Sequence, residues 1–320
     1  MICRAFLVLG MLYVITPPEG FSKALFLDVF SSYEPNTQPS PEKWTFDTGT
    51  SYPNGPAHWG TAEIQTYTTS KTNILISDQG TLLILPVKND TTTTTTTTTS
   101  QNTKRDDNNQ NQGQEKWTSS RIQSHPSFDF LCPPTQKIRL ESSIKLSSSP
   151  SQSQSGIWPA FWSLSSSFRT SPSSWPLTGE IDILESVNGL PAIYQTLHCG
   201  DPTAGPCNEP TGISHSIPLE RDVFHVFAAE IDRTNEGGGW EDEKVVWYVD
   251  GAEVFRVDGG MVGDEQAWTA MARSKRFLLL NVAVGGAFPD AVARGATPTT
   301  ETEGGRGAGM EVGYVAVWGM

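Results

Sequence analysis

The stretch that decides the fold is TGEIDILES, residues 178–186. Two isoleucines alternate with Glu180 and Asp182, as in a β-strand that has one buried and one open face. Strict alternation would put Glu185 on the opposite face from the other two acids. One extra residue at Ile183-Leu184, a β-bulge, returns Glu185 to their face. The sequence therefore predicts a bulged strand with three acids on its open face.

The rest of the chain indicates strands separated by turns. Short segments rich in β-branched and aromatic residues are bounded by Gly, Asp, Pro or Ser; they span residues 73–77, 81–85, 139–146, 223–231, 244–249 and 276–284. Asp250-Gly251 predicts a tight hairpin, because both residues readily adopt positive φ. The one helical candidate covers residues 264–273. Many strands in one large domain predict an all-β fold, either a two-sheet sandwich or a barrel.

Three acids on one strand face repel one another, which a purely structural strand seldom tolerates. Arg169 is the only Lys or Arg between Phe161 and Glu185, so no other local cation is available as a partner. Two carboxyl groups that face one groove can cleave a glycosidic bond: one attacks the anomeric carbon and the other protonates the leaving oxygen. A central Asp182 can keep the proton affinities of the two glutamates apart. The structural alternative is a solvated edge strand with scattered acids.

Composition and the N-terminal residues indicate an extracellular protein. Asp and Glu number 35 against 22 Lys and Arg, and the net charge of −13 argues against binding to nucleic acid or anionic lipid. Arg4 precedes an apolar run of 11 residues, Ala5 to Ile15, and a small residue follows at Ala24. This pattern predicts a signal peptide over residues 1–24, since a membrane span needs ~20 apolar residues. We expect a secreted protein, soluble once the signal is removed, that meets neutral ligands such as sugars.

Cysteine usage fits that compartment. Cys199 and Cys207 are close enough in sequence to form a disulfide, which leaves Cys132 unpaired once Cys3 departs with the signal peptide. The alternative is three buried thiols. No Cys/His spacing resembles a zinc site. We expect neither a metal nor a cofactor.

Residues 90–116 form a segment with almost nothing apolar to bury: Thr91 to Thr99 is an unbroken threonine run, followed by a tract rich in Asn, Gln and Asp. Such composition predicts a disordered surface insertion. It is a candidate for O-glycosylation and for cleavage at Lys104-Arg105, and Asn89-Asp90-Thr91 at its start is an N-glycosylation sequon. An unmodified low-complexity loop is the alternative.

The acid motif and six further segments resemble glycoside hydrolase family 16, the β-jelly-roll endo-glucanases. Glu180-Ile-Asp182-Ile-Leu-Glu185 resembles the family's catalytic signature in its bulged form. The six other segments follow in family order: residues 59–67 (WGTAEIQTY), 117–122 (WTSSRI), 156–162 (GIWPAFW), 247–251 (WYVDG), 280–286 (LNVAVGG) and 312–318 (VGYVAVW). The resemblance covers the chain from about Val29 to Trp318, so it is far more specific than the acid motif alone.

This resemblance implies a concanavalin A-like jelly roll of two antiparallel sheets, with one catalytic domain over residues 25–320. It makes Glu180 the nucleophile, Asp182 the assisting carboxylate and Glu185 the general acid/base of a retaining reaction. The implied activity is endo-hydrolysis of β-1,3 or mixed β-1,3/1,4 glucan by a secreted, cell-wall-associated or free monomer. Two alternatives stay open: a glucan or chitin–glucan transglycosylase, and a non-catalytic glucan-binding module.

Substrate-binding candidates follow from the way sugars bind, since C–H faces stack on aromatic rings and hydroxyls take polar partners. The candidates are Trp158, Trp162, Trp175, His198 and Glu63. Each also has a structural interpretation: the tryptophans as core residues, His198 as a residue packed beside a disulfide, and Glu63 as a bridge between strands.

Two positions depart from the family pattern. Gly313 stands where family members that bind calcium often carry an acid, which argues against a calcium site. Phe288-Pro289 replaces a frequent Trp-Pro, which weakens or alters one sugar contact.

Overall fold

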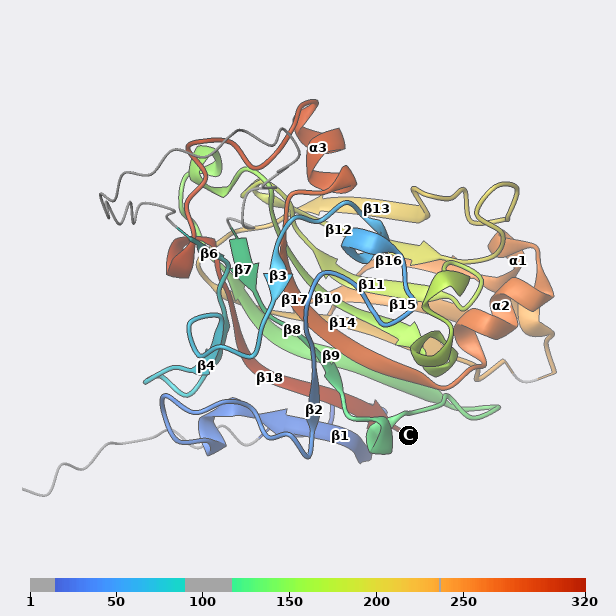
Figure 1. Cartoon of the computed structure of the whole chain (residues 1–320). Helices are drawn as coiled ribbons and strands as arrows, with labels where there is room; N and C mark the ends of the chain where they lie inside the picture. The colour runs from blue at the N-terminus through green and yellow to red at the C-terminus, as the bar shows by residue number, and fades with distance from the viewer. Residues whose placement is uncertain (1–14, 90–116, 236) are drawn as a thin grey trace, which may run out of the picture.

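In the computed structural model, residues 15–89, 117–235 and 237–320 are described, and they form two large antiparallel sheets packed face to face (Figure 1). The predicted insertion at 90–116 and most of the predicted signal peptide lie outside the described residues. The two-sheet jelly roll is confirmed, and the barrel alternative is wrong.

One sheet has eight strands in the order β16-β15-β14-β9-β18-β5-β4, with β1 added beside β18. In chain order its strands are β1 (Lys23–Val29), β4 (Ile74–Ile76), β5 (Leu82–Ile84), β9 (Lys137–Leu146), β14 (Phe224–Asp232), β15 (Lys244–Val249), β16 (Ala252–Asp258) and β18 (Met310–Gly319).

The other sheet has seven strands in the order β13-β12-β11-β10-β17-β8-β2. They are β2 (Trp44–Asp47), β8 (Arg121–Ser124), β10 (Ile157–Ser165), β11 (Glu180–Glu185), β12 (Ala192–His198), β13 (Ile213–Pro218) and β17 (Arg276–Val284). A small third sheet joins β3 (Thr66–Tyr67), β7 (Trp117–Ser119) and β6 (Val87–Lys88). The short helices are α1 (Gly259–Val262), α2 (Glu265–Ala272) and α3 (Ala287–Ala293).

The predicted local elements are present with small shifts at their ends. The strands predicted at 244–249 and 276–284 have the predicted bounds, and the other four shift by one or two residues. Asp250 and Gly251 adopt positive φ between the paired residues Val249 and Ala252, as the hairpin requires. Asp264 caps α2 by accepting a hydrogen bond from the Ala267 N–H at 2.8 Å. In the part of the chain that the structure describes, no helix is long and apolar enough to span a membrane.

The main core fills the space between the two sheets, because alternate residues of each strand point inward. Phe161, Ile181 and Leu280 of the seven-stranded sheet are fully buried there, as are Phe227 and Trp247 of the eight-stranded sheet. The opposite face of the seven-stranded sheet is the one that carries the three acids, and we call it the acid face.

Part of the acid face is covered by a second apolar cluster. Its members come from β10, β17 and the loops above them: Leu164, Phe168, Phe277 and Leu279, with Tyr52, Trp162 and Trp175 packed against them. The loops that supply Tyr52 and Trp175 meet where the Ser173 hydroxyl donates to the Asn54 carbonyl at 3.3 Å. This cluster supports two of the tryptophans that flank the acids.

Candidate active site

The predicted bulge is present in β11. Glu180 lies opposite Leu164 and Glu185 opposite Ala160, which are four residues apart on β10, although the two glutamates are five apart in sequence. The register also shifts between Asp182 and Glu185 on the β12 side. The extra residue therefore places all three acids on the acid face. At this irregularity the Asp182 carbonyl accepts a hydrogen bond from the indole N–H of Trp247 at 2.8 Å, so the opposite sheet supports the bulge.

Glu185 is 8% exposed, and its carboxylate accepts one hydrogen bond, from the indole N–H of Trp158 at 2.9 Å. Burial raises the pKa of Glu185 to about 7, and the nearby Glu180 charge adds to this effect. His198 and the Trp158 N–H act in the opposite direction. A glutamic acid with this pKa is protonated in about half of the molecules at pH 7, which suits a general acid.

Glu180 accepts a hydrogen bond from the indole N–H of Trp175 at 3.2 Å. Burial raises its pKa, while the positive charges of His198 and Arg121 counteract part of the rise. Trp158 and Trp175 thus each donate to one of the two glutamates, so two of the predicted sugar-binding residues also orient the acids.

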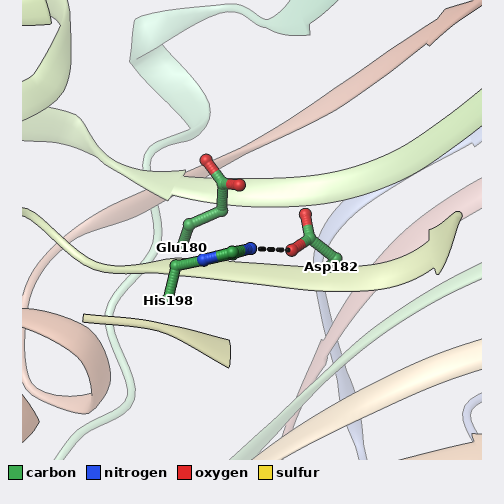
Figure 2. Close-up of side chains that lie close together, drawn as sticks. All are labelled: Glu180, Asp182 and His198. Carbon is green, nitrogen blue, oxygen red and sulfur yellow. Dashed lines mark ion pairs between the residues drawn. The ribbon is translucent and has the colours of Figure 1, made fainter. Parts of the chain in front are cut away.

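Asp182 is 3% exposed and lies between the two glutamates. Burial, followed by the charges of Glu180 and Glu185, raises its pKa well above the usual range. Figure 2 shows its carboxylate facing the imidazole of His198, with Oδ2 of Asp182 3.4 Å from Nε2. His198 pairs with Glu180 across β11 and β12, which explains why the histidine reaches the acids.

The other ring nitrogen of His198, Nδ1, lies 2.7 Å from Oε2 of Glu209. The Cys199–Cys207 disulfide is confirmed, with a Cα–Cα distance of 5.4 Å, and it closes the loop just before Glu209. Cys132 is buried and free, as predicted. His198 therefore packs beside the disulfide, as the structural interpretation predicted, and also lies against Asp182.

Glu180, Asp182 and His198 each offer one ligand atom, and these atoms lie within 4.8 Å of one another, close enough to approach a single cation. Both nitrogens of the His198 ring already face carboxylates, one from Asp182 and one from Glu209. The cluster is therefore accounted for by an ion-pair network of protein groups.

Glu63 does not reach the acids. It is 5% exposed, and its carboxylate accepts hydrogen bonds from Thr61, Gln65 and Tyr67 at 2.7–2.8 Å. The three donors lie within four residues of Glu63, so the carboxylate is engaged in a local network. This network argues against direct sugar binding, and among the described residues the carboxylate forms no direct bridge to a neighbouring strand.

Trp162 lies on the acid face and is linked to Glu63 through a chain of hydrogen bonds. Its indole N–H donates to Asn281 at 2.7 Å, Asn281 donates to the Tyr67 hydroxyl at 3.1 Å, and Tyr67 donates to Glu63. The Arg121 guanidinium lies 4.7 Å from the Trp162 ring. Glu63 thus acts on the site through the orientation of Trp162.

Several residues near the acids were not predicted. Arg276 is fully buried on β17, and one of its guanidinium N–H groups donates to the carbonyl of Gly179 at 3.2 Å, immediately before Glu180. It is a cation near the acids that the local sequence around β11 does not contain. Phe288 meets Trp158 and Tyr194 edge-on, at ring distances of 5.6 and 5.0 Å. Only Phe288 had a signal in the sequence, its departure from the family pattern.

Comparisons with known proteins show the family. The sequence model of the XgeA-like catalytic GH16 domain matches residues 87–262. The structure is similar to the crystal structure of an endo-1,3-beta-glucanase from Streptomyces sioyaensis, with 34% identity, a TM-score of 0.81, and coverage of 96% of this chain and 99% of that one.

Two curated proteins are more distant relatives. Glucan endo-1,3-beta-glucosidase A1 of Niallia circulans is 28% identical over 86% of this chain, which spans only 35% of that longer protein. A beta-1,3-glucan-binding protein of Penaeus monodon is 31% identical over 51% of this chain and 55% of its own length. The family model covers more than half of the chain, and the Streptomyces structure is matched over almost its whole length. The chain belongs to glycoside hydrolase family 16 and has the fold of its endo-glucanases.

Proposed function

We propose that this chain is a retaining endo-β-glucanase that cleaves internal β-1,3 linkages, alone or within mixed β-1,3/1,4 glucans. The observation that carries the proposal is the bulge in β11, which puts Glu180, Asp182 and Glu185 on one face beside Trp158 and Trp175. The 1,3 linkage is favoured because the relatives above are named as 1,3-glucanases or a 1,3-glucan-binding protein.

In this mechanism Glu180 attacks the anomeric carbon while Glu185 gives its proton to the leaving oxygen. Glu185 then takes a proton from the water that hydrolyses the glycosyl-enzyme. The raised pKa of Glu185, about 7, supports the first half of this cycle. Asp182 lies between the two glutamates, where its protonation state sets the charge that each of them experiences.

Anion rescue tests the two glutamate roles. In Glu185→Ala the nucleophile remains, so an aryl β-glucoside with a good leaving group forms the glycosyl-enzyme without a general acid. Added azide then attacks the glycosyl-enzyme in place of water, needs no base, displaces the Glu180 carboxylate and gives a β-glycosyl azide after two inversions. In Glu180→Ala azide attacks from the opposite face and gives the α-azide. The reverse pattern would exchange the two roles, and no rescue in either variant would contradict the catalytic proposal.

A product profile distinguishes the proposed hydrolase from the two alternatives. The chain is incubated with laminarin, lichenan and a chitin–glucan mixture, and the products are sized over time. Early shortening of polymer with short oligosaccharide products supports endo-hydrolysis. Re-joined chains of greater length would indicate a transglycosylase, and unaltered polymer that retains the protein would indicate a glucan-binding module.

We also propose that the protein is secreted and acts as a monomer on extracellular glucan. The net charge of −13 and the N-terminal apolar run support this proposal. Lys23 and Ala24 pair with Gly319 and Trp318 in the sheet, so cleavage at the predicted boundary would shorten β1 by two residues. Mass spectrometry of the protein from a culture medium tests both secretion and the cleavage position.

A further inference from the structure

The imidazole of His198 is enclosed on several sides. Asp182 and Glu209 face its two nitrogens, and the Trp175 ring lies 5.3 Å away. Gly212 closes another side, because a Cβ at this position would lie 2.9 Å from the imidazole. The ring therefore has one orientation, with Nε2 toward Asp182.

Glu209 is itself fixed from two directions. Its side chain is 1% exposed; Oε1 accepts the Cys199 N–H at 3.0 Å, and Oε2 lies 2.7 Å from Nδ1 of His198. The disulfide to Cys207 ties down the loop two residues before it. A carboxylate held in this way accepts hydrogen bonds only, so Nδ1 keeps its proton.

This arrangement confines a second proton to the contact between His198 and Asp182. The proton lies either on Nε2, where the imidazolium faces the Asp182 carboxylate as an ion pair at 3.4 Å, or on Asp182 beside a neutral ring; the net charge is the same. Burial lowers the pKa of His198, but Glu209, Glu180 and Glu185 together raise it above its usual value. Burial and the neighbouring carboxylates raise the pKa of Asp182. Both shifts favour a proton held within the His198–Asp182 pair.

We propose that Glu209 is a positioning residue of the reaction: by holding the Nδ1 proton of His198, it directs Nε2 to Asp182 and keeps one proton within the His198–Asp182 pair. This inference rests on the proposed glucanase function. Among the described residues, the charged groups that face the His198 ring are Glu180, Asp182 and Glu185 from β11 and Glu209 from the loop after β12.

The charge of His198 affects both reacting glutamates, because a positive His198 lowers the pKa of Glu180 and of Glu185. Glu209→Gln keeps the size of the side chain but cannot satisfy both donors, since an amide has only one acceptor oxygen for Cys199 N–H and His198 Nδ1–H. In this variant His198 loses its charge at lower pH. The pKa of Glu185 then rises further, and the alkaline limb of the pH profile moves upward.

The test measures two things on Glu209→Gln and on wild type. The first is the side-chain ¹⁵N chemical shifts of His198 in the resting enzyme, assigned with His198→Asn. The second is kcat and KM for a soluble laminarin oligosaccharide across pH. We expect Nδ1 to be protonated at every pH in wild type and to titrate in the variant. We also expect kcat to fall about tenfold with KM nearly unchanged, and the alkaline limb to rise by roughly 0.5–1 pH unit.

Asp201→Asn is the matched control, since Asp201 is an exposed acid of the same loop that binds Thr203 rather than His198. It should match wild type in every measurement. An unprotonated Nδ1 in wild type would overturn the proposal, and this result needs no variant to fold. A Glu209→Gln enzyme with unchanged kcat and limbs would also overturn it. If wild type cleaves no glucan, the proposed function is contradicted, and the ¹⁵N shifts still test the Glu209–His198 interaction.

Discussion

Two buried glutamates, Glu185 and Glu243, illustrate how this fold separates chemistry from stability. They are 8% and 3% exposed, and each accepts one indole N–H at 2.9 Å, from Trp158 and Trp268 respectively. The difference lies in the cations. Glu243 also binds the guanidinium groups of Arg233 and Arg273, whereas Glu185 forms no ion pair among the described residues.

The pKa values of the two glutamates shift in opposite directions, because Glu243 has arginine partners and Glu185 has none in the described part of the chain. Burial alone would raise the pKa of Glu243, but hydrogen bonds from Arg273, Arg233 and Trp268 lower it below its usual value. Burial raises the pKa of Glu185 to about 7. The ion pairs thus favour the anionic form of Glu243, and burial without an ion pair lets Glu185 exchange a proton near neutral pH.

The largest expected effect is on catalysis. Glu180→Gln removes the attacking oxygen with almost no change in volume, so activity on laminarin should fall by at least about a thousandfold. The circular dichroism spectrum should stay that of wild type. A variant that keeps more than a tenth of the activity would contradict the role given to β11.

The second effect is on pH dependence, and it sharpens the comparison. In the proposed mechanism Glu185 must be protonated to donate to the leaving oxygen, so kcat/KM on polymer should decline above about pH 7. The Trp158 N–H lowers the pKa of Glu185, so Trp158→Phe should move this limb to higher pH. Trp268→Phe, which removes the matching N–H from Glu243, is the control and should leave the limb in place.

Third, the two glutamates should give opposite stability changes at pH 8. A raised pKa means that the Glu185 contribution to stability is lost as pH rises from 4.5 toward 7, so Glu185→Gln should stabilise the fold by about 2 kcal/mol. A lowered pKa means that Glu243 contributes fully to stability above about pH 4.5 and that this contribution is lost as the pH falls further.

Glu243→Gln should therefore cost about 2 kcal/mol at pH 8, because two arginines lose their partner, and less in acid. Urea unfolding at pH 8 and pH 4 measures both variants. Changes of the same sign at pH 8 would break the comparison.

The smallest effect concerns an exposed carboxylate. Asp264 caps α2 through the Ala267 N–H, so Asp264→Ala should cost about 1 kcal/mol with no change in the pH profile of activity. Thermal unfolding beside the pH profile checks this. A shift in the alkaline limb of the activity profile would mean that charges outside the site also affect the pKa of Glu185.

The sequence was most informative where local pattern and function coincide. Glu180 and Glu185 are an odd number of residues apart, so they can share one strand face only if the strand has a bulge, and β11 has this bulge. Asp250-Gly251 predicted the hairpin, and the spacing of Cys199 and Cys207 predicted the disulfide; the structure contains both. In each case the residues that decide the structure are neighbours in the chain.

Contacts between distant segments could not be predicted in the same way. Glu209 reaches His198 only because the loop after β12 folds back under the disulfide, and Arg276 reaches Gly179 across the seven-stranded sheet. Glu63, a predicted sugar-binding residue, instead accepts from Tyr67, whose hydroxyl also accepts a hydrogen bond from the distant Asn281. Such outcomes depend on packing, which a single sequence does not specify.

The pairing of β1 with β18 determines where the molecule can be attached to a surface or to a fusion partner. Lys23 lies opposite Gly319, so the first and last strands run side by side in the eight-stranded sheet, while the acids lie on the outer face of the other sheet. A tether joined beside Lys23 or Gly319 would leave from the sheet that does not carry the acids. An immobilised or fused enzyme would then present its acid face outward to polymer from either attachment point, and a short linker between Lys23 and Gly319 would let the chain be reopened at a loop far from Glu180.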